Sequence, residues 1–151
     1  MQINIKKLTG TAKIPTRGSY SAAGYDLYSN ESSIITIQPH TTYKIHTGIA
    51  VEIPEGYFGA IFARSGIATK RGLRPANCVG VIDADYRGEV IVALHNDTET
   101  AHYVPLEDRV AQLIVIPFMP LEFNEVAELS STERDIGGFG STDENTGNGN
   151  S

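Results

Sequence analysis

Cysteine and tryptophan are nearly absent, since the 151-residue chain has one cysteine, Cys78, and no tryptophan. One cysteine cannot form an intrachain disulfide, and the first ten residues lack the apolar stretch of a secretory signal, so we expect an intracellular protein. Long hydrophobic runs are also missing, because no segment approaches the roughly 20 apolar residues that cross a bilayer. The sequence therefore predicts a protein without a membrane partner.

Positive charge is scarce as well. The chain has 12 lysine and arginine residues against 18 aspartate and glutamate residues, which gives a formal net charge of -6. A nucleic acid polymer needs a basic face that displaces counterions, so we expect no such partner. A small phosphorylated ligand needs only a few cations, and Arg64, Arg109 and Arg134 stand in segments that could supply them.

Patterns of metal ligands and of common hydrolases are missing too. The histidines His40, His46, His95 and His102 show no metal-ligand spacing, and Cys78 has no partner at CxxC distance, which argues against zinc. The motifs GxSxG and HExxH do not occur, so a triad hydrolase or a zincin has no support.

Short β-forming runs are what the chain does contain. Apolar residues make up 40% of it, and Val, Ile, Thr and Tyr recur beside 15 glycines, a bias towards strands and tight turns. Residues 43–53 alternate as in a half-buried strand, interrupted at Gly48. Residues 90–96 and 109–116 are nearly continuous apolar runs, as expected for core strands covered on both faces. We predict an all-β fold.

Only residues 66–72 indicate a helix, with Ser65 ahead of them as a candidate N-cap. Residues 121–130 fit either a helix or an extended arm. After Glu133 the composition shifts to Gly, Asn and Ser, too poor in apolar residues to pack a core. We therefore expect one β domain over residues 1–133 and a flexible glycine-rich tail over residues 134–151.

The segment VIDADYRG, residues 81–88, fits two interpretations. In the first, Asp83 and Asp85 are ordinary turn residues that bond nearby amides, and Gly88 relieves a strained angle. In the second, the two carboxylates project from one side of the turn, where a carboxylate can take a proton from water. Tyr86 would then offer a flat face to a sugar.

Two other segments could bind phosphate. In ARSG, residues 63–66, the amides after Arg64 begin the expected helix, where anions bind, although a plain helix cap with a solvated arginine explains the same residues. In RDIGGFGST, residues 134–142, a flexible arm that closes over a base and its phosphates would explain the lone aromatic Phe139. An incidental disordered tail is the alternative.

Taken in order, five segments resemble the five motifs of the trimeric dUTP pyrophosphatase (dUTPase) family. They are AGYDLYS (23–29), ARSG (63–66), GVIDADYRGE (80–89), DRVAQLI (108–114) and RDIGGFGST (134–142). The resemblance implies an antiparallel jelly-roll-like β-barrel and a homotrimer whose active sites each combine motifs from three subunits. It also implies the hydrolysis of dUTP to dUMP and pyrophosphate with Mg²⁺, a metal that is commonly held by substrate phosphates and waters.

The resemblance also assigns roles to individual residues. Asp83 matches the carboxylate that activates the water attacking the α-phosphorus, Asn77 would read the uracil edge, and Tyr86 would pack on the deoxyribose. Other positions would contact the substrate or support the site: Arg64, Ser65, Gly66, Gln112, Arg134, Ser141 and Thr142 on the phosphates, Phe139 over the uracil, Gly140 also at the substrate, and Asp26 and Asp85 in support.

A few positions depart from the family pattern. The last motif often reads RGxGGFGSTG, whereas this chain carries Asp135 and Asp143, whose charges oppose triphosphate binding unless they point outward. Asp135 can adopt a positive φ more easily than most residues, so we expect the backbone path to persist. Ala63 replaces a proline, and we expect a minor effect.

Two other functions compete with this interpretation. A dCTP deaminase shares the fold and the phosphate-binding logic but releases ammonia, and the tyrosine and complete tail motif favour the dUTPase instead. A catalytically inactive β-trimer could serve as a nucleotide sensor or a protein-binding module, against which the intact Asp83 argues.

Overall fold

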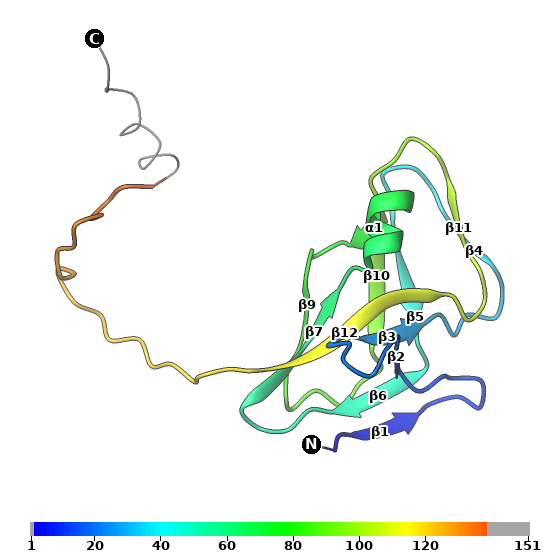
Figure 1. Cartoon of the computed structure of the whole chain (residues 1–151), viewed down its shortest axis with the longest axis horizontal. Helices are drawn as coiled ribbons and strands as arrows, with labels where there is room; N and C mark the ends of the chain where they lie inside the picture. Colours follow the sequence, from blue (N-terminus) through cyan, green and yellow to red (C-terminus); the bar gives the residue numbers. More distant parts are fainter. Residues whose placement is uncertain (1, 139–151) are drawn as a thin grey trace, which may run out of the picture. The chain divides into compact units, whose positions relative to one another are not determined.

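Short antiparallel strands build most of the protein. The computed structural model describes residues 2–138. In chain order, its elements are β1 (Asn4–Lys7), β2 (Thr16–Arg17), β3 (Tyr25–Tyr28), β4 (Ile35–Ile37), β5 (Thr42–His46), β6 (Ile49–Glu52), β7 (Tyr57–Phe62), α1 (Ser65–Arg71), β8 (Leu73–Pro75), β9 (Gly80–Ile82), β10 (Ile91–Asn96), β11 (His102–Val104) and β12 (Arg109–Pro117) (Figure 1).

The strands form several small sheets that mix distant parts of the chain. The largest has the order β2-β3-β12-β7-β9, and the others are β5-β10-β8, β11-β4 and β1-β6. Every pairing among the described strands is antiparallel. The predicted all-β, jelly-roll-like fold is confirmed. Within the described part of the chain, no helix is long and apolar enough to span a membrane.

The core lies between these sheets and draws on nearly every strand. Val92 and Leu94 of β10 and Val110, Ala111 and Leu113 of β12 belong to one buried cluster. The two apolar runs therefore form core strands, as predicted. The prediction that both faces are covered is wrong for β10 within a single chain, because its buried residues alternate with partly exposed ones.

The expected interruption at Gly48 separates β5 from β6. Gly48 has a φ of +67°, and a Cβ there would lie 2.4 Å from Asn30 Nδ2. A side chain would therefore be strained in the backbone and would also collide with Asn30. Glycine is required at this turn, and the break predicted from the sequence is confirmed.

Helix α1 occupies the predicted place but begins differently. Arg64, in an extended conformation, is the residue that precedes the helix, and it makes no side-chain capping bond. Ser65 is already the first helical residue, so the prediction of Ser65 as N-cap is wrong. Gly72 ends the helix in the left-handed conformation, and its N–H bonds to the Ala68 carbonyl at 3.1 Å, as is common for a C-terminal glycine.

The described residues divide into two units, one over Met1–Pro120 and one beginning at Leu121. The second unit has neither helix nor strand among residues 121–138. The helical alternative for residues 121–130 is therefore wrong. Phe139, Gly140, Ser141 and Thr142, which the sequence assigns to the substrate, lie outside the described residues, as does Asp143.

Candidate functional site

The loop that follows β9 forms one wall of a pocket of about 220 Å³. A tight turn over residues 83–86 closes with a 3.1 Å hydrogen bond from the Tyr86 amide to the Asp83 carbonyl. Asn77, Asp83 and Tyr86 all line this pocket, which we call the nucleoside pocket. Its other lining residues come from β7, β9 and the chain entering β10, namely Ile61, Gly80, Val81, Ile82, Glu89, Val90 and Ile91.

Two glycines keep space around residues of the nucleoside pocket. A Cβ on Gly80 would lie 3.2 Å from Ile61 Cβ, which is tighter than ordinary contact, so glycine at this position lets β9 lie close to β7. A Cβ on Gly88 would lie 2.4 Å from the Tyr86 hydroxyl oxygen. Glycine at position 88 therefore leaves space for the phenol of Tyr86, whose hydroxyl donates to the Glu89 carbonyl at 3.0 Å.

Asp83 and Asp85 do not share a site. Asp83 is exposed at the nucleoside pocket, whereas Asp85 lines a different hollow beside Glu52 and Arg87. The expectation that both carboxylates project from one side is therefore wrong. The reason is that Asp83 is the first residue of the turn and Asp85 the third, so the backbone bends between them. The supporting role assigned to Asp85 stays a prediction.

A second pocket, of about 520 Å³, collects the other predicted contacts. We call it the phosphate pocket. Asp26, Arg64, Ser65, Gly66 and Gln112 line it, together with Arg109, which the sequence marked only as a possible cation. The remaining lining residues are Gly18, Ala22, Ala23, Gly24 and Ile114. No residue lines both this pocket and the nucleoside pocket.

Asp26 organises the cations of the phosphate pocket. Its Oδ1 accepts a 2.6 Å hydrogen bond from Arg64 Nε, and its Oδ2 lies 3.4 Å from Arg109 Nη1. The Asp26 side chain is only 12% exposed, so solvent screens these ion pairs less than surface pairs. Because Asp26 engages one nitrogen of Arg64, the guanidinium is held in place with donors left for an anion.

Gln112 is held in place by the strands on either side of β12. In β12 it faces Phe62 on one side and Asp26 on the other, and its Nε2 donates to the Ala63 carbonyl at 2.8 Å. A Cβ on Gly24 would lie 2.2 Å from Gln112 Oε1. Glycine at position 24 therefore leaves the space that the side chain of Gln112 occupies.

The start of the last motif forms a turn. The Gly137 amide donates to the Arg134 carbonyl at 2.9 Å, and Arg134 Nε donates to the Gly137 carbonyl at 2.9 Å. Asp135 has a φ of 42°, which confirms the expectation that it follows a backbone path suited to glycine.

Glu89 and His46 are functional candidates that the sequence analysis did not single out. Glu89 lines the nucleoside pocket, and its Oε2 lies 2.8 Å from His46 Nδ1. Burial disfavours the charged form of Glu89, but hydrogen bonds from His46 and the Gly48 and Thr47 amides outweigh it and lower the pKa of Glu89. The bond to Glu89 raises the pKa of His46 against a smaller effect of burial. Glu89 lies in a motif, but no local signal marked His46.

In the described part of the chain, no group of three or more His, Cys, Asp or Glu side chains could hold a metal ion. The nucleoside pocket offers two carboxylates, an amide and an aromatic ring, and the phosphate pocket offers two arginines and a carboxamide around Asp26. The first set suits a nucleoside and an activated water, and the second suits a chain of phosphates.

Comparisons with known proteins agree with these features. The dUTPase family model matches residues 10–143. The deoxyuridine 5'-triphosphate nucleotidohydrolase of Nautilia profundicola is 46% identical over 142 residues, covering 94% of this chain and 99% of that protein. The enzyme of the same name from Candida albicans is 45% identical over 135 residues, covering 88% of this chain and 82% of the relative.

Solved structures give the same result. A mutant dUTPase of Staphylococcus bacteriophage 80alpha, solved with dUpNHpp, has a TM-score of 0.86 at 29% identity, covering 93% of this chain and 98% of that chain. A mutant dUTPase of phage phi11, described with a structural Mg(II) ion, has a TM-score of 0.78 at 26% identity, covering 87% and 100%. The resemblance found in the sequence is confirmed, and the chain belongs to the dUTPase family.

Proposed function

We propose that this protein hydrolyses dUTP to dUMP and pyrophosphate in a reaction that requires Mg²⁺. The observation that carries the proposal is the division of the predicted residues between two pockets, one suited to a nucleoside and one to phosphates. Family membership and the relatives named above support it. In an intracellular setting, the reaction would keep uracil out of DNA and supply dUMP for thymidylate synthesis.

The nucleoside pocket would select the base and the sugar. Asn77 and the hairpin backbone up to Asp83 would pair with the uracil edge, and Tyr86 would pack on the deoxyribose and leave no room for a 2′-hydroxyl. A pocket built for the O4 and N3–H of uracil presents mismatched groups to cytosine, which can discriminate by about 10⁴ or more.

Asp83 would act as the general base. Its exposed carboxylate would take a proton from a water whose oxygen forms a bond to the α-phosphorus. The bond between that phosphorus and the bridging oxygen of the β-phosphate breaks, and pyrophosphate leaves with the electron pair. Such transfer gains most from positioning and charge neutralisation, which the second pocket supplies.

The phosphate pocket would bind the triphosphate chain. Arg64 would contact it with the donors that Asp26 leaves free, beside Ser65, Gly66 and Gln112. Asp26 would also support the site near the metal. From the tail, Arg134, Ser141 and Thr142 would contact the terminal phosphates, while Phe139 would cover the uracil beside Gly140.

The donor set suits Mg²⁺ bound mainly through the substrate. Asp26, a carboxylate of the phosphate pocket, is engaged by Arg64 and Arg109, so the pocket offers phosphate ligands rather than a cage of acidic groups. Mg²⁺ keeps several waters and is commonly held by substrate phosphates. When bound there, it would neutralise negative charge on the phosphate oxygens.

A homotrimer would bring the two pockets together. No residue lines both pockets of one chain. This supports a site in which the nucleoside pocket of one subunit faces the phosphate pocket of another. The tail, residues 134–151, would come from a third subunit and close the site over the domain formed by residues 1–133.

The test is to incubate the purified protein with Mg²⁺ and either dUTP or dCTP. The proposal predicts pyrophosphate and dUMP from dUTP. Ammonia from dCTP without pyrophosphate from dUTP would identify a deaminase instead. Binding of dUTP without any product would identify an inactive nucleotide sensor.

A further inference from the structure

The carboxylate of Glu89 connects the nucleoside pocket to a strand far away in the sequence. Its Oε2 lies 2.8 Å from His46 Nδ1, and its Oε1 accepts a 2.7 Å hydrogen bond from the Gly48 amide. The Glu89 side chain is 23% exposed, whereas that of His46 is 53% exposed. Both oxygens of Glu89 are therefore engaged, one by the last residue of β5 and one by the turn between β5 and β6.

Backbone contacts reinforce this attachment on both sides. The Val90 amide donates to the Ile49 carbonyl at 2.8 Å, and the Thr47 hydroxyl donates to the Val90 carbonyl. On the other side, the His46 amide donates to Glu31 Oε1 at 2.8 Å. The end of the loop after β9 is thus fixed to the end of β5 and the turn that follows it, and the end of β5 is itself bonded to Glu31.

Tyr86 depends on this attachment through the backbone of Glu89. Its hydroxyl donates to the Glu89 carbonyl at 3.0 Å, and Gly88 gives the phenol the space to do so. A carbonyl whose residue is held by two side-chain hydrogen bonds is a fixed acceptor. If Glu89 lost those bonds, the acceptor and the ring of Tyr86 would gain freedom together.

We propose that Glu89, held by His46 and Gly48, is a positioning residue that fixes the ring of Tyr86 and thereby sets the selectivity for deoxyribose over ribose. This inference rests on the proposed function, because it assumes that Tyr86 packs on the sugar. Glu89 acts here through the tyrosine and takes no part in activating the water.

The consequence for kinetics follows from where Tyr86 acts. A ring with more freedom packs less well on deoxyribose, so the KM for dUTP rises. It also excludes a 2′-hydroxyl less strictly, so the ratio of kcat/KM for dUTP to that for UTP falls. Asp83 and the phosphate pocket are untouched, so kcat for dUTP changes little.

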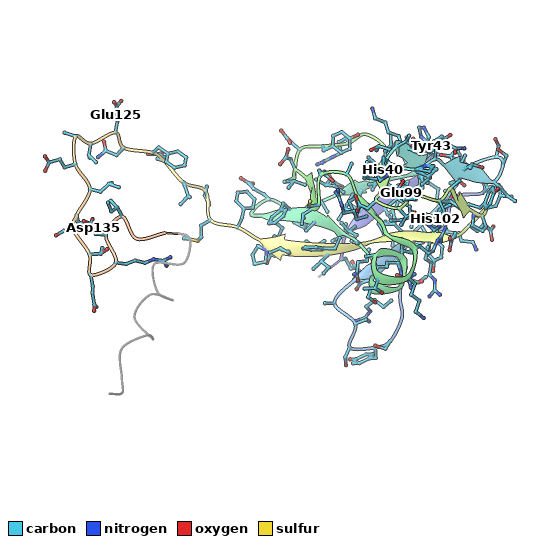
Figure 2. All side chains as sticks on the ribbon, turned by 90° about the horizontal axis from the view of Figure 1, so that it is seen from above. His40, Tyr43, Glu99, His102, Glu125 and Asp135 are labelled. Carbon is cyan, nitrogen blue, oxygen red and sulfur yellow. The ribbon has the colours of Figure 1, made fainter. Side chains whose placement is uncertain are left out.

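The experiment compares Glu89→Ala, Glu89→Gln and His46→Ala with wild type, using kcat and KM for dUTP and UTP and a thermal melt of each variant. Glutamine keeps a carbonyl oxygen for the Gly48 amide, so it should rescue part of the loss. His40→Ala and Glu99→Ala serve as matched controls, because they break a second, exposed His–Glu contact of 2.9 Å (Figure 2).

We expect Glu89→Ala to lower the dUTP-to-UTP selectivity by about tenfold, the size of losing one hydrogen bond to a charged group. The loss should lie mainly in KM, with a smaller effect in Glu89→Gln and none in the controls. If Glu89→Ala fails to fold, Glu89→Gln and His46→Ala carry the same test. Unchanged selectivity in folded variants, or an equal loss of kcat for both substrates, overturns the inference. Absence of dUTP hydrolysis by wild type would instead overturn the proposed function.

Discussion

Among the individual residues, Asp83 has the most specific proposed role, that of the general base. It stands exposed on the turn after β9, and Asn77 and Tyr86 line the same pocket. The motif in the sequence pointed to Asp83 as a candidate. That Asp83 and Asp85 line two different pockets could not be predicted. That partition depends on the direction of each side chain in a tight turn, which residue spacing alone does not determine.

Asp83→Asn should fold and bind dUTP but lose turnover. The amide keeps the shape of the side chain and cannot accept the proton, so we expect kcat to fall by about 10²–10⁴. Binding of the analogue dUpNHpp should stay close to the wild-type affinity, and a thermal melt controls for folding. Near-normal pyrophosphate release from the variant would remove Asp83 from the role of base.

The His46–Glu89 pair should make stability depend on pH. The raised pKa of His46 means that its contribution is fully present below its ordinary value of 6.5 and is lost as pH rises through the folded pKa. The lowered pKa of Glu89 means that its contribution is present above its ordinary value of 4.5 and is lost as pH falls. The pair therefore stabilises most between about pH 4.5 and 6.5, with Glu31 adding attraction for the imidazolium.

Urea unfolding of wild type and His46→Ala across this pH range measures the effect. The difference in unfolding free energy should be largest in the mildly acidic window and should shrink towards alkaline pH. A difference that grows above neutrality would contradict the assigned sign. His40→Ala, in the exposed His–Glu contact, is the control.

Among the elements, β12 does most to position the phosphate pocket. It pairs with both β3 and β7, so Gln112 lies between Asp26 and Phe62. The apolar run of β12, the interruption at Gly48 and the short helix were predictable, because each has a local pattern. The attachment of residue 89 to residue 46 was not, because it joins side chains 43 positions apart.

Gly24→Ala tests how closely β3 and β12 approach. The new Cβ would lie 2.2 Å from Gln112 Oε1, the end of a flexible side chain, so Gln112 should turn away while the fold persists. We expect a change in stability within about 1 kcal/mol and a fall in kcat/KM for dUTP of roughly tenfold. Gly10→Ala, with no atom within 4 Å of the new Cβ, is the matched control. Equal activity of the two variants would argue against a role for Gln112.

For the whole molecule, we expect the core to stabilise the fold and the tail to close the active site. Among the described residues, the buried cluster begins at Ala12 and ends at Leu113. The family and the fold could be inferred from motif order, whereas the roles of the individual site residues stay predictions. The separation of nucleoside and phosphate residues into two pockets required coordinates, since all five motifs lie on one chain.

Truncation after Glu133 should leave the oligomer intact and suppress catalysis. The buried cluster of the described residues stays in the truncated chain, while Arg134 and the rest of the last motif are lost. Size-exclusion chromatography with light scattering measures the first part, and pyrophosphate release the second. A dissociated or unfolded product would show that the tail builds the assembly rather than closing the site.

We propose that one dUTP site joins the nucleoside pocket of one subunit to the phosphate pocket of another. The most direct test mixes Asp83→Asn subunits with Arg64→Ala subunits, denatures and refolds them together, and measures pyrophosphate release from dUTP. Each variant alone should be inactive, and random mixing in equal amounts should restore about a quarter of the sites. Mixed trimers that stay as inactive as their components would contradict the account.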